Sequence, residues 1–402
     1  MEAGVEQVVE KVVIGANKAL AAPAFPEAEM LQIEDLNAML AYCMDNGVED
    51  LVLLCGMPWA IKWSGRVIIQ GQRALFKEEL DTLLEKMTRN TNSSLDIYRC
   101  SDADFIYVMQ RFSKKYRFRV NVTATLDAKG AGRGLHFVIR PANPRILTFD
   151  DLNVHPEIRR IARPQNGIVI VTGPTGSGKT TLLDSTLHAQ ATDPLGKHIL
   201  VFGAPVEGDL NSIPNKTAII GQSNIGSESY GNDLKTFKDA VRNSLRRHPD
   251  IVYFTEARDR ETIEGAVLVS QTGHLCYTTT HTPSVHMTLP RMGDEFGGSD
   301  RVRVLKNLAE NTRAIIHQRL LPTPTGVGRS PVVSFLEFTA DIRAQLMRAP
   351  VDDMAEMIFR FTRERGLDLL TDAKSQLAAK KISEESYEGI RQELEMEGHG
   401  AV

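Results

Sequence analysis

Hydrophobic and polar residues follow different patterns in different parts of the chain. Apolar and polar residues alternate from Tyr116 to Val122 and again from Leu135 to Ile139, on either side of a glycine-rich loop. A period of two is typical of half-buried strands, and the loop indicates an antiparallel hairpin. Two further stretches are expected to be strands (51–54 and 63–69) and two to be helices (36–40 and 75–87). We therefore predict an α+β domain built on an antiparallel sheet.

From residue 168 onward, short apolar runs alternate with amphipathic stretches. We expect strands at 168–172, 198–202, 251–255 and 275–280, and helices at 179–190, 234–246 and 259–271. Such alternation predicts a mostly parallel sheet with helices on both faces. Ligands of such sheets bind at the carboxyl ends of the strands.

Beyond Arg301 the pattern becomes mainly helical. One apolar helix face is expected to contain Leu305, Leu308, Thr312, Ile315 and Ile316. A strand is expected at 330–339, and surface helices are expected near 350–364, 367–380 and 383–396.

Two proline-rich stretches divide the chain. The prolines near 23–26 end any helix in the N-terminal segment, and those near 141–145 indicate a linker. We therefore expect an N-terminal arm (1–30), an α+β domain (31–140), a linker (141–150), an α/β domain (151–348) and C-terminal helices (349–402).

Composition excludes several classes of protein. The chain has 402 residues, 42% hydrophobic and 24% charged, which fits a globular protein of two or three domains. Its net charge of −4 argues against general nucleic-acid binding. The four scattered cysteines form no C-x-x-C pair, so a zinc module is not expected. We expect the cysteines to be reduced thiols of a cytosolic protein. Neither a signal peptide nor a membrane-spanning apolar run is apparent, so work at a membrane would require a partner.

The run GPTGSGKT from Gly173 to Thr180 fits the pattern G-x-x-x-x-G-K-[ST] between a predicted strand and a predicted helix. In that context glycines let backbone N–H groups face a phosphate, and the start of the helix adds its positive end. Lys179 can then reach the β- and γ-phosphates, and the Thr180 hydroxyl can bind Mg²⁺. The predicted nucleotide-binding residues are Gly173, Pro174, Thr175, Gly176, Ser177, Gly178, Lys179, Thr180 and Thr181. The sequence therefore predicts a site for ATP and Mg²⁺.

Hydrolysis of ATP also needs a carboxylate near Mg²⁺ and a group that orients water. Glu256 ends an apolar strand as a Walker B acid does, although a solvated acid is the alternative. Glu207 follows the strand at 198–202 and could polarise the attacking water, although loop acids are commonly solvated. His274 and His281 bracket a strand and could respond to the γ-phosphate, although a lone histidine is more often structural.

A basic group follows the alternating strands. Arg117 and Arg119 fall on the face opposite the apolar row, and Arg133 and Arg140 follow in the next strand. They fit either a solvated sheet face or an arginine finger that a neighbouring subunit offers to the nucleotide.

Residues 35–345 resemble the hexameric traffic ATPases of type II and type IV secretion, conjugation and pilus retraction, in particular the retraction-type (PilT-like) and Dot/Icm-type (DotB-like) members. The resemblance depends on motifs in the expected order: the phosphate loop (173–181), an acidic box (202–207), the Walker B region (241–259), a histidine box (272–282) and the arginine-bearing strand (116–121).

The resemblance implies a fold and roles for particular residues. The fold would be a RecA-like P-loop NTPase core with an N-terminal α+β domain of PAS-like type. Glu207 would be the catalytic glutamate, and Glu256 would be the Walker B acid. His281, supported by His274, would read the nucleotide state. The arginines implied to reach the phosphates through the domain interface are Arg119, Arg133 and Arg140.

It also implies a function. The chain would be a cytoplasmic, Mg²⁺-dependent ATPase that acts as a homo-oligomeric ring, a hexamer, at the inner face of a membrane. Hydrolysis would rotate one domain against the other and transmit force to a membrane-embedded secretion, conjugation or pilus apparatus.

One departure from the family pattern keeps alternatives open. Gly203 and Ala204 stand where the family carries acids, so turnover could be slow unless Asp209 compensates. A nucleotide-gated adaptor with little hydrolysis is therefore one alternative. A helicase-like nucleic-acid motor is the other, although the net charge is negative and no basic patch with interleaved aromatic residues is seen.

Overall fold

The computed structural model describes residues 30–63, 66–99, 101–111, 114–127, 132–142, 145–226, 230, 232–325 and 328–396. By their contacts, residues 1–102 with 122–141 form one compact unit, and residues 103–121 with 142–402 form another. The expected N-terminal arm lies, except for Met30, outside the described residues, as does part of the expected linker. The predicted domain boundaries stay a prediction.

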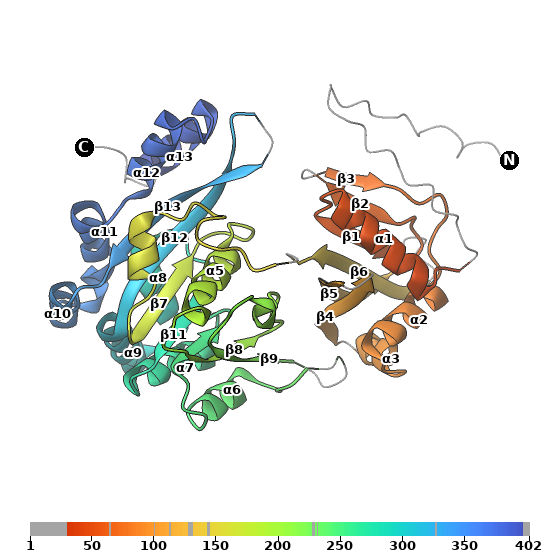
Figure 1. The fold of residues 1–402 in the computed structure, drawn as a ribbon, viewed down its shortest axis with the longest axis horizontal. Coiled ribbons are helices and arrows are strands. Elements are labelled where there is room, and N and C mark those ends of the chain that lie inside the picture. Colours follow the sequence, from red (N-terminus) through yellow and green to blue (C-terminus); the bar gives the residue numbers. More distant parts are fainter. Residues whose placement is uncertain are drawn as a thin grey trace. The chain divides into compact units, whose positions relative to one another are not determined.

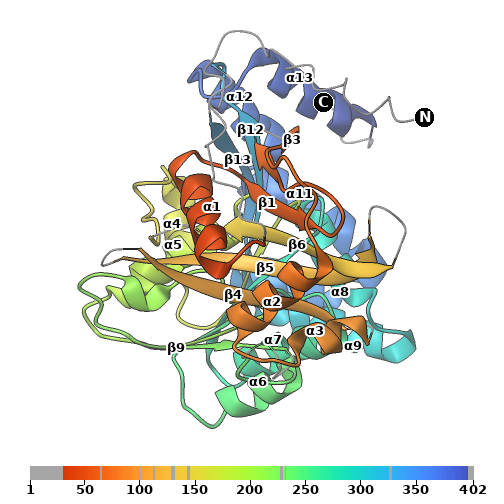
Figure 2. The same cartoon turned by 90° about the vertical axis from the view of Figure 1, so that its right-hand side faces the viewer.

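The N-terminal part of the chain forms a six-stranded sheet in the order β3-β2-β1-β6-β5-β4. Its strands are β1 (Asp50–Leu54), β2 (Ala60–Trp63), β3 (Arg66–Ile69), β4 (Asp102–Arg111), β5 (Lys114–Leu126) and β6 (Arg133–Pro141). Three helices accompany them: α1 (Ile33–Asp45), α2 (Lys77–Thr88) and α3 (Ser93–Tyr98). Figures 1 and 2 show these helices together on one face of the sheet.

The alternating pattern determines which side chains enter this core. Phe118 and Val120 of β5 and Phe137 of β6 are fully buried, as are Leu36 and Leu40 of α1. Backbone hydrogen bonds at both ends of the pair, Asp127 N to Gly132 O (3.0 Å) and Ala142 N to Arg117 O (2.9 Å), show that β5 and β6 are antiparallel. The predicted hairpin is therefore confirmed.

The prediction of one buried strand at 63–69 is wrong. Trp63 is the last residue of β2, and Arg66–Ile69 is a separate strand that pairs with β2 in the antiparallel sense. Val67 and Ile69 are 69% and 58% exposed, because β3 is an edge strand. The pattern also failed to indicate β4 and α3.

The C-terminal part of the chain forms a seven-stranded sheet in the order β13-β12-β7-β11-β10-β8-β9. Its strands are β7 (Gly167–Thr172), β8 (His198–Gly203), β9 (Ile219–Asn224), β10 (Ile251–Phe254), β11 (Leu275–Thr280), β12 (Thr312–Pro322) and β13 (Arg329–Glu337). All neighbouring pairs are parallel except β12 and β13. The predicted mostly parallel sheet is confirmed, although β9 was not foreseen.

Helices cover both faces of this sheet (Figure 1). They are α4 (Pro156–Ile161), α5 (Lys179–Ala191), α6 (Phe237–Ser244), α7 (Arg260–Gln271), α8 (Val285–Gly293), α9 (Gly298–Asn311), α10 (Ala340–Arg348), α11 (Met354–Arg365), α12 (Leu369–Ala378) and α13 (Glu384–Met396). Ile168 and Ile170 pack with α7 and α9, whereas Val169 and Val171 pack with α4 and α5. Successive residues of β7 thus enter two separate cores, which explains its continuous apolar run.

The prediction that one helix face extends from Leu305 to Ile316 is wrong. Leu305 and Leu308 lie on α9, but this helix ends at Asn311 and β12 begins at Thr312. Ile315 joins the core on one face of the sheet and Ile316 the core on the other. A short apolar run does not distinguish a buried strand from a helix. The helix expected at 234–246 is also shorter than predicted, and α8 and α10 were not foreseen.

The predicted C-terminal helices are present as α11, α12 and α13. Buried residues Leu369, Ala373 and Ile390 join α12 and α13 to Val332 of β13 in one apolar cluster. The carboxylate of the buried Asp372 accepts a hydrogen bond from the backbone N–H of Val333 (2.8 Å), and burial raises its pKa.

The parallel strands bring the sequence motifs to one edge of the sheet. The phosphate loop follows β7, Glu207 follows β8, Glu256 follows β10 and His281 follows β11. Because these strands are parallel neighbours, their carboxyl ends meet at the same edge. No helix among the described residues has the length and apolar character needed to cross a membrane.

Two buried tyrosines at paired positions allow a test of this core. Tyr277 Oη donates to Ala162 O (2.8 Å) and accepts from Gln190 Nε2 (3.0 Å), whereas the neighbouring Tyr253 Oη has no partner among the described residues. Tyr277→Phe leaves two buried polar groups unsatisfied and should lower the free energy of unfolding by about 1–3 kcal/mol. Tyr253→Phe should lower it much less. Urea unfolding of both variants measures the difference, and equal losses would contradict the assignment.

Candidate nucleotide-binding site

Three glycines give the phosphate loop its shape. The backbone φ angles of Gly173, Gly176 and Gly178 are +143°, +77° and +83°. Residues with a side chain rarely adopt these positive angles. A Cβ atom on Gly173 would lie 2.2 Å from the backbone oxygen of Gln318, so β12 packs directly against the loop. Gln318 Nε2 also donates to Ser177 O (2.6 Å). The packing of Gln318 and this hydrogen bond therefore fix the loop to β12.

Lys179 lies inside this loop at the first position of α5. Its ammonium group donates to Gly173 O (2.9 Å) and Pro174 O (3.0 Å) and is buried. Burial lowers the pKa of Lys179, and the negative charge of Glu256 partly opposes this effect. The charge of Lys179 therefore lies beside the backbone carbonyls of the loop.

The residues of the loop fit a bound phosphate group. The first N–H groups of α5 have no acceptor within the helix and form the positive end of its dipole. Ser177 Oγ is buried and has no partner among the described residues. A buried hydroxyl, free amides and an ammonium group together make a donor-rich cradle, which is the chemistry that an oxyanion requires.

His281 connects Lys179 to Glu256. Its Nδ1 lies 3.4 Å from Lys179 Nζ, and its Nε2 lies 3.5 Å from Glu256 Oε1. Burial and the charge of Lys179 lower the pKa of His281, although Glu256 acts in the opposite direction. A neutral ring that accepts at Nδ1 and carries its proton at Nε2 satisfies both partners. The structure thus brings three predicted site residues together.

Glu207 lies in a different set of contacts. Its carboxylate accepts from Arg119 Nη1 (2.8 Å), and Arg119 also pairs with Asp104 (2.6 Å). The hydrogen bonds to Asp104, together with the negative charges of Asp104 and Glu207, raise the pKa of Arg119. Arg117 donates to the backbone oxygens of Val206 and Glu207 (2.9 and 3.1 Å). Arg119 therefore holds the carboxylate that was expected to activate water.

Asp184 adds a carboxylate that was not predicted. It lies one turn beyond Thr180 on α5, and a Cβ on Gly208 would lie 2.4 Å from its Oδ2, so the loop after Glu207 packs against it. Burial, supported by the charge of Glu207, raises the pKa of Asp184 to about 7. Only the spacing of four from Thr180 could have drawn attention to this residue.

The remaining predicted residues have other partners. Arg133 donates to Tyr98 O (2.9 Å), and Arg140 forms a bidentate pair with the buried Asp50 (2.7 and 3.1 Å). His274 precedes β11 and contacts Thr272, so it lies at the opposite edge of the sheet from His281, which follows β11. The roles expected for these residues stay predictions.

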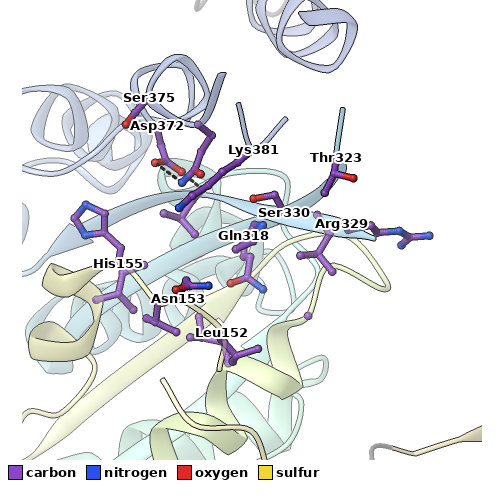
Figure 3. A pocket seen from close by; sticks show the side chains of 18 of the residues that line it. Leu152, Asn153, His155, Gln318, Thr323, Arg329, Ser330, Asp372, Ser375 and Lys381 are labelled. Carbon is purple, nitrogen blue, oxygen red and sulfur yellow. Dashed lines mark hydrogen bonds between the residues drawn. The ribbon is translucent and has the colours of Figure 1, made fainter. Parts of the chain in front are cut away.

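Two cavities flank the phosphate loop. The larger, about 1020 Å³, has Gly178, Thr181 and Lys381 among its lining residues. Figure 3 shows Asn153 and Asp372 on opposite walls of this cavity, with Gln318 and Arg329 also among its labelled side chains. The other cavity, about 500 Å³, contains the tip of the loop from Pro174 to Ser177 together with His281.

Residues of β12 complete the walls of these cavities. Gln318 contacts the loop, and Arg319 lines the cavity at its tip. Sequence reasoning missed both because it assigned part of this strand to a helix. In the described part of the chain, no group of three or more His, Cys, Asp or Glu side chains is placed to hold a metal ion.

Comparisons with known proteins agree with this geometry. The family described as "Type II/IV secretion system protein" matches residues 98–390. The type IV pilus retraction ATPase PilT of Pseudomonas aeruginosa is 30% identical over 324 residues, which cover 81% of this chain and 88% of PilT.

Two solved structures have the same fold. The Legionella pneumophila ATPase DotB has a TM-score of 0.76 and 29% identity, covering 90% of this chain and 97% of DotB. The pilus retraction motor PilT, solved with bound ADP, has a TM-score of 0.71 and 25% identity, covering 88% of this chain and 95% of PilT. The expected fold and family are confirmed: the chain belongs to the type II/IV secretion system protein family, as a traffic ATPase similar to PilT and DotB.

Proposed function

We propose that this chain binds ATP at the phosphate loop with Mg²⁺, hydrolyses it, and works as a hexameric ring. The ring would act in the cytoplasm, at the inner face of a membrane, and would power a type IV secretion, conjugation or pilus apparatus. The observation that carries this proposal is the contact series Lys179–His281–Glu256 at the mouth of a glycine-shaped phosphate loop. PilT, which the chain resembles in sequence and fold, is known from a structure with bound ADP.

Each residue of the series has a task in the proposed reaction. Lys179 exchanges its two backbone acceptors for phosphate oxygens, which are stronger partners because they are charged. His281 then registers the change, since its Nδ1 lies within reach of the same ammonium group. Mg²⁺, when bound through Thr180 and Glu256, would neutralise charge that develops on the phosphates. His274 would support this response from the opposite edge of the sheet.

The nucleoside would occupy the larger cavity. Gly178 and Thr181 belong both to this cavity and to the phosphate-binding segment, so a nucleotide can extend from one into the other. The cavity has room for a base and a ribose, because ligand pockets typically measure about 300–1000 Å³. C-terminal residues such as Asp372 and Lys381 would then border the nucleoside.

Glu207 would orient the water that attacks the γ-phosphate. In this structure Arg119 pairs with Glu207, so the carboxylate must be released or shared before it can accept a proton. The resemblance assigns Arg119, Arg133 and Arg140 to phosphate contacts in the ring, and Arg119 could act there only by leaving Glu207. This coupling would let a neighbouring subunit control the timing of hydrolysis.

The same ion pair favours a second candidate function. A carboxylate neutralised by Arg119, with Gly203 and Ala204 in place of further acids, would suit a nucleotide-gated adaptor with little hydrolysis. A nucleic-acid motor has less support, because the net charge is −4. Turnover measurements decide between the ATPase and the adaptor.

Lys179→Ala should weaken ATP binding by roughly a hundredfold, because it removes the one charged donor inside the loop. Lys374→Ala, which removes an exposed lysine of α12, is the matched control and should bind as the wild type does. Calorimetric titration with ATP and Mg²⁺ measures both. Wild-type affinity in Lys179→Ala would refute the proposed site.

Glu207→Gln should retain ATP binding but lower the rate of phosphate release by roughly a hundredfold or more, as expected when a general base is lost. Glu261→Gln, an exposed acid in the first turn of α7, serves as the control. Steady-state phosphate release under saturating ATP is the measurement. If the wild type and Glu207→Gln release phosphate at the same slow rate, the adaptor is the correct interpretation.

A further inference from the structure

The C-terminal helix α13 places a carboxylate in the wall of the cavity at the tip of the phosphate loop. The lining of this cavity includes Pro174, Gly176, Ser177 and His281. Arg319 of β12 and Glu393 of α13 belong to the same lining. A residue more than two hundred positions from the loop in sequence thus borders the same space.

Arg319 and Glu393 form a bidentate ion pair. Arg319 Nη1 lies 2.6 Å from Glu393 Oε2, and Nη2 lies 2.9 Å from Oε1. The Arg319 side chain is only 17% exposed, whereas that of Glu393 is 43% exposed. The hydrogen bonds from Arg319 lower the pKa of Glu393, so the carboxylate is ionised at neutral pH. The arginine is therefore the more buried partner, and the glutamate is the more exposed one.

The third contact of Arg319 carries no charge. Its Nε donates to Nε2 of the buried His317 (3.3 Å). Burial and the positive charges of Arg319 and Lys179, together with His286, lower the pKa of His317 to about 3. His317 therefore remains a neutral acceptor that orients Arg319 without neutralising it. Among the described residues, Glu393 is the carboxylate that pairs with Arg319.

A guanidinium group that fits a carboxylate with two hydrogen bonds fits a phosphate group equally well. Polyphosphate bound at the loop would bring negative charge into the cavity that Arg319 lines. We propose that Arg319 is a phosphate-binding residue of this site and that Glu393 is the carboxylate it exchanges for nucleotide phosphate. This inference builds on the proposed binding of ATP at the phosphate loop.

The exchange would make α13 sensitive to nucleotide. Ile390 is the buried residue of α13, and Tyr387 and Leu394 pack partly buried against the same apolar cluster with α12 and β13. The Arg319–Glu393 pair adds a charged contact between this helix and β12. Transfer of Arg319 to a phosphate group would loosen α13 and signal occupancy of the site to the C-terminal end of the chain.

Binding of the non-hydrolysable analogue AMP-PNP with Mg²⁺ to the full chain tests this exchange by calorimetry. Arg319→Gln should weaken binding roughly tenfold, because a charged donor is lost. Glu393→Gln should tighten binding, by roughly threefold, because Arg319 no longer has a charged competitor. The double variant should resemble Arg319→Gln, since Glu393 acts through the arginine.

Glu395→Gln is the matched control, because Glu395 lies on the same helix but pairs with Arg391. It should bind AMP-PNP as the wild type does. A purely structural ion pair predicts that Arg319→Gln and Glu393→Gln change affinity in the same direction or not at all, and either result would overturn the exchange. If Arg319→Gln does not fold, the comparison of Glu393→Gln with Glu395→Gln decides alone.

Hydrogen exchange of α13 supplies a second measurement. Backbone amides in Glu384–Met396 should exchange faster when AMP-PNP is added to the wild type, and slower or unchanged exchange would contradict the proposal. Lys179→Ala separates the two levels of inference. Wild-type binding in that variant means that the proposed function is wrong, whereas lost binding there with unchanged affinity in both ion-pair variants means that only the exchange is wrong.

Discussion

The close packing of the phosphate loop on β12 is the constraint on which the rest of this structure depends. Gly173 approaches the backbone of Gln318 so closely that no side chain fits, and Gln318 holds the loop at Ser177. This packing fixes the curvature that directs Lys179 toward the loop carbonyls and His281. A buried ammonium group is costly unless it has partners, so the loop, the lysine and the ends of β7 and β11 form one structural unit.

Charge at the site is arranged in two ion-paired groups that hydrolysis would have to rearrange. In one, Arg119 joins Glu207 to Asp104, and the charge of Glu207 contributes to the raised pKa of Asp184. In the other, Arg319 joins the C-terminal helix to β12. Each arginine is satisfied by a carboxylate within the chain, and each is of a type that binds phosphate well. Exchange of such partners is a simple way for a triphosphate to alter protein contacts without any new hydrophobic surface.

Sequence reasoning placed the motifs at strand ends more accurately than it set the bounds of the surrounding helices and strands, and the roles of the site residues stay predictions. The phosphate loop, Glu256 and His281 were assigned correctly to strand ends at one edge of the sheet, because their motifs are local and contiguous. Glu207 was also placed at that edge, but its pairing with Arg119 was not foreseen, since the two residues are 88 positions apart. The error at Thr312–Ile316 had a functional consequence, because it concealed Gln318 and Arg319 on the strand that supports the loop.

The sequence by itself determined the local chemistry: a glycine turn that favours a phosphate, a lysine beside it, and apolar runs that form a parallel sheet. Only the tertiary structure decided which distant polar side chains meet, as in the ion pair of Arg319 with Glu393 and the hydrogen bond of Lys179 with His281. The physical reason is that backbone conformation and hydrophobic periodicity are set by neighbours in sequence. Ion pairs between separate elements instead depend on how strands are ordered and how helices pack, which no local pattern records.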